Sequence, residues 1–114
     1  MNRRSELLSD LYTTLALQPQ MVTIEETDPM WDLKDMQDFV GGLIERVSLY
    51  NGDDLIINEE GLYLDLPMNL KATQLFYASI GEGDKNAGLD FARKNRIPPI
   101  LGDVLLIKGG LRDA

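Results

Sequence analysis

The sequence contains no cysteine and no histidine. The first absence excludes disulfides and cysteine-containing zinc sites, and the second excludes the histidine triads that hold catalytic metals. Together they also exclude the Ser–His and Cys–His pairs of nucleophilic catalysis. We therefore expect a protein that is not an enzyme and that holds no metal ion or cofactor.

Long apolar runs are also missing, because no stretch approaches the roughly 18 residues that a membrane span needs. Arg3 and Arg4 lead into a segment interrupted by Glu6 and Asp10, which is unlike a signal peptide. We expect a cytoplasmic protein with no membrane partner. A length of 114 residues suits one compact domain.

Positive charge is scarce, since 11 Lys and Arg stand against 19 Asp and Glu for a net charge of −8. A chain of this charge attracts phosphate backbones poorly, so we do not expect direct binding to nucleic acid. Most of the excess lies in residues 21–69, which hold two basic and twelve acidic side chains. This block is either a solubilising surface or a face that meets a basic partner.

Hydrophobic periodicity predicts an α+β fold, with a helical extension over residues 1–18 and a single domain over residues 19–114. Helices are expected at residues 3–15, from Asp28 and Pro29 to Val40, after Asn69, and at 86–95. Strands are expected at residues 21–25, 43–50, 55–57, 62–66 and 101–108.

The expected strands form an antiparallel meander packed by several short helices. An Asn51-Gly52 turn joins the strands at 43–50 and 55–57, and a second turn leads into the strand at 62–66. The apolar run at 104–107 does not alternate, which predicts a closing strand buried in the middle of the sheet.

Four short motifs occupy the middle of the chain: Val40-Gly41-Gly42 followed by Ile44-Glu45, then Asn58-Glu59-Glu60-Gly61, Leu66-Pro67-Met68-Asn69 and Gly102-Asp103. In this order they resemble domain-of-unknown-function family 3846 over about residues 20–110. The resemblance implies a small accessory protein of phages, plasmids or bacterial genomes, and it implies no reaction. The leucine-rich segment at 3–15 precedes the recognised region, and we expect it to support a homo-oligomer.

Binding is favoured over catalysis, and five residues are the candidates for a ligand or partner site. Asn58 and Glu59 lie at a strand end, and Asn69 opens a helix whose N-terminus can receive an anion. Arg46 and Lys71 are the nearest cationic side chains for an anionic group. A turn and a helix cap are the structural alternatives for these polar residues.

Two functions remain open at this point. The first is a non-catalytic binding protein of a phage or mobile element, which sequesters a small molecule of the nucleotide-signal type, or a host protein, to counter a host defence. The alternative is an acidic, DNA-mimic-like decoy that covers a basic surface of a host protein. A third interpretation, carboxylate chemistry with a bound metal ion, has no recognisable motif.

Overall fold

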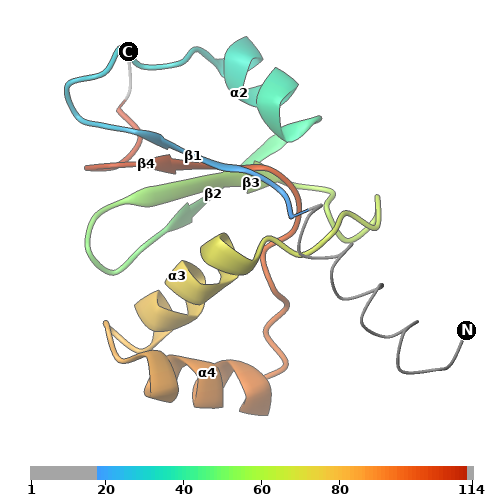
Figure 1. Cartoon of the computed structure of the whole chain (residues 1–114), viewed down its shortest axis with the longest axis vertical. Coiled ribbons are helices and arrows are strands. Elements are labelled where there is room, and N and C mark those ends of the chain that lie inside the picture. Colours follow the sequence, from blue (N-terminus) through green and yellow to red (C-terminus); the bar gives the residue numbers. More distant parts are fainter. Residues whose placement is uncertain (1–17, 113–114) are drawn as a thin grey trace, which may run out of the picture.

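A computed structural model describes residues 18–112 as a four-stranded sheet between two helical layers (Figure 1). The helix predicted at residues 3–15, on which the expected homo-oligomer depends, lies outside this range. The strands are β1 (Met21–Ile24), β2 (Ile44–Ser48), β3 (Asp54–Asn58) and β4 (Val104–Ile107). The helices are α2 (Leu33–Val40) on one face and α3 (Leu70–Ile80) with α4 (Lys85–Lys94) on the other. The predicted α+β class is confirmed.

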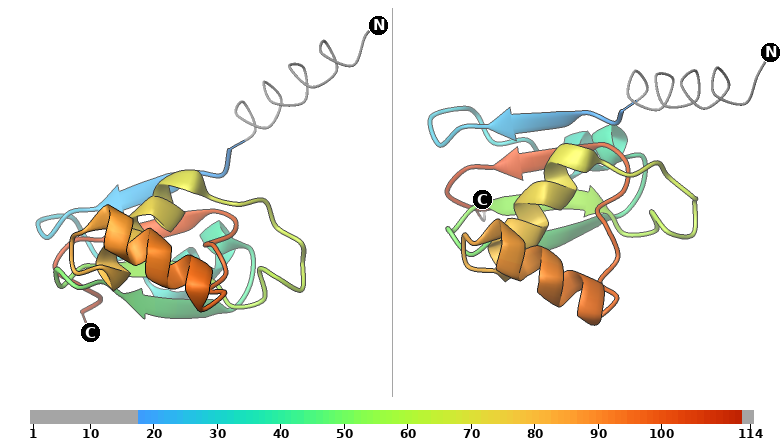
Figure 2. Two further views of the ribbon diagram at one scale, coloured as in Figure 1. Left: turned by 90° about the horizontal axis from the view of Figure 1, so that it is seen from below. Right: turned by 60° about the horizontal axis from the view of Figure 1, so that its bottom comes forward.

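The sheet has the order β1-β4-β3-β2, as Figure 2 also shows. The β2–β3 hairpin turns at Asn51 and Gly52 as predicted, and Gly52 has the positive φ of 93° that such a turn favours. β4 pairs antiparallel with β3 and parallel with β1, and all four of its residues are buried. This confirms the prediction of a central closing strand.

The prediction of a third strand in the meander is wrong, because residues 59–65 form consecutive turns. The N–H of Leu64 donates to Glu60 O at 2.9 Å and that of Leu66 donates to Gly61 O at 3.0 Å. Asp65 has a φ of 53°, which no strand residue adopts. β4 takes the place beside β3 instead, because its unbroken apolar run fills both faces of a central strand.

The predicted start of the first core helix is also wrong, since α2 begins after Asp32 and not at Asp28. Asp32 accepts from the N–H of Asp35 at 2.8 Å, and the side chain of Asp35 accepts in return from the N–H of Asp32. This capping box satisfies two amides that would otherwise have no partner. Asp28 instead accepts from the N–H of Glu25 at 2.9 Å in a turn. The helix ends at Val40 as predicted, and Gly41 is its C-cap with a φ of 84°.

Two apolar cores lie on opposite faces of the sheet, and the strands contribute to them alternately. The core beneath α2 contains Ile24, Met36, Val40, Ile56, Leu105 and Ile107. The core beneath α3 contains Leu49, Leu55, Ala72, Ile100, Val104 and Leu106. β4 therefore needs apolar side chains in both directions. Within residues 18–112, no helix is long and apolar enough to cross a bilayer.

Candidate functional site

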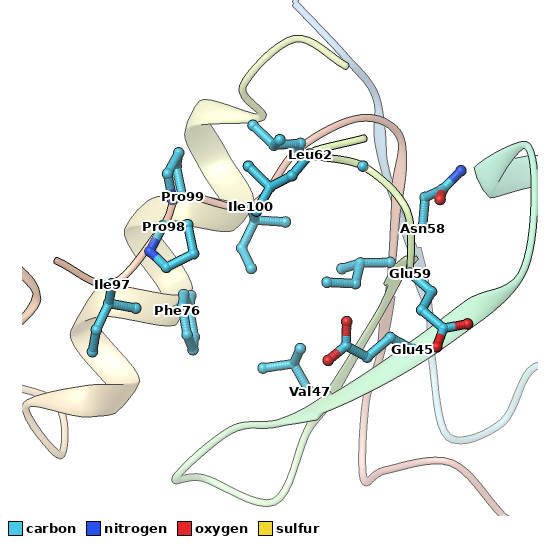
Figure 3. A pocket seen from close by; sticks show the side chains of 13 residues that line it. Glu45, Val47, Asn58, Glu59, Leu62, Phe76, Ile97, Pro98, Pro99 and Ile100 are labelled. Carbon is cyan, nitrogen blue, oxygen red and sulfur yellow. The ribbon is translucent and has the colours of Figure 1, made fainter. Parts of the chain in front are cut away.

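A pocket of about 200 Å³ opens between the β2–β3 hairpin and the segment that follows α4 (Figure 3). Side chains of the hairpin form one wall, and α3 with residues 97–100 forms the other. The lining is mainly apolar, with contributions from Val47, Ile57, Leu62, Phe76, Ile97, Pro98, Pro99, Ile100 and Leu101. Among the described residues, the charged side chains that line it are Glu45 and Glu59.

The wall at residues 97–100 is held firmly against α3. Its two consecutive prolines fix their own backbone angles and restrict the residues before them. The Thr73 hydroxyl accepts from the N–H of Ile100 at 3.0 Å and donates to the carbonyl of the same residue at 3.3 Å. The Tyr77 hydroxyl donates to Ile97 O at 3.0 Å. This half of the pocket is therefore preformed.

The sheet wall depends on the alternation of side chains in β2. Glu45 and Val47 point to the same face as Ile57, which lies directly across the hairpin from Glu45. In Figure 3 the carboxylate of Glu45 turns toward the space between the walls, whereas that of Glu59 points away from it. The pocket thus combines an apolar surface with one directed negative charge.

Asn58 borders this pocket, but its polar atoms are used within the protein. The side chain is buried; Nδ2 donates to Val40 O at 3.0 Å, and Oδ1 accepts from the N–H of Glu60 at 2.8 Å. The first bond satisfies a carbonyl at the end of α2, and the second shapes the turn after β3. Asn58 therefore positions the pocket's rim, and Glu59 follows it on that rim.

Asn69 is the N-cap of α3 and joins three segments of the chain. Its Oδ1 accepts from the N–H of Ala72 at 3.1 Å, while Nδ2 donates to the carbonyls of Gln20 and Gly102, both at 3.0 Å. The side chain is 1% exposed. Its donors and acceptor are thus occupied in the folded protein.

The two predicted cationic residues do not join the pocket. Arg46 points to the α2 face of the sheet, where its Nε lies 3.8 Å from Oδ2 of Asp54. Lys71 borders a separate hollow beside residues 18–22, together with Asn69. The five predicted residues therefore lie in three places: Asn58 and Glu59 lie together, Asn69 and Lys71 lie together, and Arg46 lies apart from both pairs.

The sequence did not identify Glu45, Phe76 or the Pro98–Pro99 wall as site residues. Glu45 was visible as a motif residue, and the alternation of β2 pairs it with Val47. That Phe76 and the prolines lie opposite these two residues depends on tertiary packing, for which the sequence carries no local signal.

Asp53, in the turn between β2 and β3, forms an ion pair with Lys108. Asp53 is buried, and its carboxylate accepts from Lys108 Nζ at 2.8 Å, Gly109 N–H at 2.9 Å and Asn51 Nδ2 at 3.1 Å. Burial acts to raise the pKa of Asp53, but these donors outweigh it and hold the pKa below its ordinary value of 3.8. The hydrogen bond and the charge of Asp53 in turn raise the pKa of Lys108.

The free energy of unfolding is expected to fall as the pH drops below about 4. Because the pKa of Asp53 is lower in the folded chain than in the unfolded chain, its contribution is fully present above 3.8 and is lost as the pH falls through the lowered value. Asp53→Asn should cost about 2 kcal/mol near neutral pH, the scale of a hydrogen bond to a charged group. It should also flatten this acid dependence. Urea unfolding at several pH values measures both effects.

The exposed pair of Asp90 and Lys94, with 3.0 Å between Oδ2 and Nζ, provides the control. Asp90→Asn should change the stability by less than about 0.5 kcal/mol, because exposed pairs contribute little. An equal acid dependence in the Asp53→Asn variant and the wild type would contradict the assignment.

Comparison with known proteins gives a family and no closer relative. No curated protein and no solved structure matches the chain. In the part of the chain that the structure describes, no three His, Cys, Asp or Glu side chains come together as a metal site. The family described as domain of unknown function (DUF3846) matches residues 12–111, which is the family that the four sequence motifs indicated. The chain therefore belongs to the DUF3846 family.

Proposed function

We propose that the protein is a non-catalytic binding protein whose pocket between the hairpin and residues 97–100 takes an apolar ligand with a positive charge. The observation that carries this proposal is the carboxylate of Glu45, which is directed into an otherwise apolar space. Apolar walls favour a ligand by removing its surface from water. The carboxylate selects among apolar ligands for those that carry an ammonium or guanidinium group.

The size of the pocket narrows the class of ligand. A volume of about 200 Å³ lies below the roughly 300–1,000 Å³ of sites for drug-sized molecules. A small amine fits this space, and so does one long side chain of a partner protein. Both ligands expected from the sequence, a small molecule and a host protein, therefore stay within the proposal.

The charge of the lining changes the ligand that we expect. A nucleotide-type signal needs cationic groups or free backbone amides around its phosphates. Among the described residues, no lysine or arginine lines this pocket, and Lys71 lies beside another hollow. We therefore propose a cationic ligand and keep sequestration, in a mobile-element setting, as the mode of action.

The alternative of an acidic decoy has less support from the described surface. Three acidic residues follow one another at α2: its N-cap Asp32, then Asp35 and Asp38 within the helix. The first two form the capping box, and the third pairs with Lys34 at 2.9 Å. These carboxylates thus cap or pair within the helix, whereas Glu45 lines a pocket.

Phenethylamine is the probe that tests the pocket, because it joins an apolar ring to an ammonium group. We expect binding with a dissociation constant of the order of 1 mM, about 4 kcal/mol, measured from amide shifts in NMR spectra. Glu45→Gln should weaken binding about fivefold, since it removes an ion pair of about 1 kcal/mol. Shifts should concentrate on Val47, Phe76 and residues 97–100.

Glu60→Gln is the matched control, because Glu60 lies next to Glu59 in the same turn but does not line the pocket. It removes the same charge and should leave the dissociation constant unchanged. Equal weakening by both variants would indicate a general effect of net charge and would contradict the proposal. So would equal binding of phenethyl alcohol, which lacks the ammonium group.

A further inference from the structure

The strand β2 ends the sheet on one side, within the part of the chain that is described (Figure 2). Glu59 N–H donates to Leu43 O at 2.9 Å, and Leu49 N–H donates to Asp53 O at 2.8 Å. Hydrogen-bonded positions alternate along an antiparallel pair, so residues 43, 45, 47 and 49 direct their backbone groups toward β3. The N–H and C=O groups of Ile44, Arg46 and Ser48 therefore point outward along the edge.

The pocket borders this edge of the sheet, because two residues of β2 line it. Glu45 and Val47, which form its sheet wall, are the β2 residues whose side chains point toward α3 and residues 97–100. Residues directly opposite each other in paired strands place their side chains on the same face. A strand added beside β2 would thus present every second side chain to the pocket, next to Glu45 and Val47.

We infer that β2 receives an extended peptide segment of a partner protein, added antiparallel, with a basic side chain opposite Glu45 and an apolar one opposite Val47. This inference rests on the proposed function and names the ligand class as a peptide strand. Backbone hydrogen bonds to the outward groups of β2 provide the attachment, and the charged apolar pocket selects the side chains. Antiparallel addition is the more stable arrangement per residue.

The net charge of −8 favours a basic partner over a second copy of this chain, because two copies repel each other. Two antiparallel copies of β2 centred on Glu45 would place that carboxylate opposite its symmetry mate. Centred on Arg46, they would place two guanidinium groups opposite each other. Like charges directly across a strand pair are destabilising. A segment with lysine or arginine opposite Glu45 meets the opposite charge instead.

The test uses a labelled peptide, acetyl-Thr-Leu-Thr-Leu-Thr-Arg-Thr-amide, and fluorescence anisotropy with the full chain. Its arginine lies opposite Glu45, its second leucine opposite Val47 and its first leucine opposite Leu49. Its last three threonines lie opposite Ile44, Arg46 and Ser48, whose backbone groups point outward. N-methylation of the threonine amides should weaken binding at least tenfold, because it removes the bonds to the strand. N-methylation of the leucine amides, which face away from β2, should change binding less than twofold.

Ser48→Pro provides the same test on the protein. Its N–H points outward, so proline removes an edge donor without removing a bond to β3. It should weaken the peptide about tenfold and leave phenethylamine binding unchanged, which also shows that the pocket remains folded.

Each result has a defined meaning. Equal effects of the two N-methylated peptides, or no peptide binding while phenethylamine still binds, would overturn the strand addition and leave the proposed function standing. Peptide binding with the expected amide dependence but no amine binding would support the edge and contradict the pocket proposal. A dimer that Ser48→Pro dissociates, seen by light scattering together with absent peptide binding, would assign the edge to a second copy and overturn the inference.

Discussion

Replacing Asn69 with alanine is expected to lower the free energy of unfolding by about 3 to 4 kcal/mol, which is a large part of the stability of a domain of this size. The variant loses a helix cap, which contributes about 1 kcal/mol. It also leaves the carbonyls of Gln20 and Gly102 without their donor in a buried place, at about 1 kcal/mol or more each. Urea unfolding followed by circular dichroism measures the sum.

Asn69→Asp separates the two roles of this side chain. Aspartate is as good an N-cap as asparagine, so a residue that only caps α3 would tolerate the change. Here the new carboxylate would stand against two carbonyl oxygens that now receive the Nδ2 protons. We therefore expect Asn69→Asp to be at least as unstable as Asn69→Ala at neutral pH.

Asn86→Ala is the control, since the side chain of Asn86 is exposed on α4 and only its N–H takes part in a cap. It should change the stability by less than about 0.5 kcal/mol. A stable Asn69→Asp variant would show that the hydrogen bonds to Gln20, just before β1, and to Gly102, just before β4, contribute little.

Asn58 and Asn69 were predicted as candidate binding residues, and their side chains instead form hydrogen bonds within the protein. The partners of their Nδ2 atoms lie far away in the sequence, so neighbouring residues do not indicate these bonds. Asn69 was predicted as a helix cap, and it is one. That its amide also joins residues 20 and 102 depends on contacts across the fold, which neither residue signals. Asn58 follows the same pattern, because its partner Val40 lies 18 positions earlier.

The sequence predicted correctly the turns and helix ends that are determined by one or two adjacent residues. The Asn51-Gly52 turn and the end of α2 at Gly41 both follow from backbone angles that glycine adopts easily. The alternation of Leu62, Leu64 and Leu66 predicted a strand, yet these residues form turns. A strand needs a neighbour, and the place beside β3 is taken by β4, nearly fifty residues later.

The pocket could not be predicted for a related reason. Its walls come from β2, from α3 and from the segment after α4, which lie far apart in the sequence. The proline pair disfavours a helix at residues 97–100, and the structure has no helix or strand there. What the prolines face is set by the Thr73 and Tyr77 hydroxyls, which hold the segment against α3.

Replacing Gly88 with alanine is expected to destabilise the protein by about 3 kcal/mol, although intrinsic helix propensity alone predicts a gain of about 1 kcal/mol. Gly88 lies inside α4 at its crossing with α3. A Cβ atom placed on it would stand 1.7 Å from Tyr77 O and 2.7 Å from Tyr77 C. Both are backbone atoms, so no side-chain rotation relieves the contact and the two helices must separate.

The separation should be visible locally as well as in the total stability. α4 buries Gly88 and Ala92 against its neighbour, and it leads directly into the pocket wall at residues 97–100. We expect faster amide exchange throughout α4 in the Gly88→Ala variant, with β3 and β4 less affected. Phenethylamine binding should also weaken in this variant, because α4 no longer holds the pocket wall at residues 97–100 in place.

Ala87→Gly is the matched change in the opposite direction, one position earlier on the exposed side of α4. It removes an exposed methyl group, so it should cost about 1 kcal/mol through helix propensity alone. If the crossing did not exclude a side chain, Gly88→Ala would instead stabilise the protein by a similar amount. Both variants should therefore lower the free energy of unfolding if the backbones of α3 and α4 approach as closely as the structure indicates. If they do not, only Ala87→Gly should lower it.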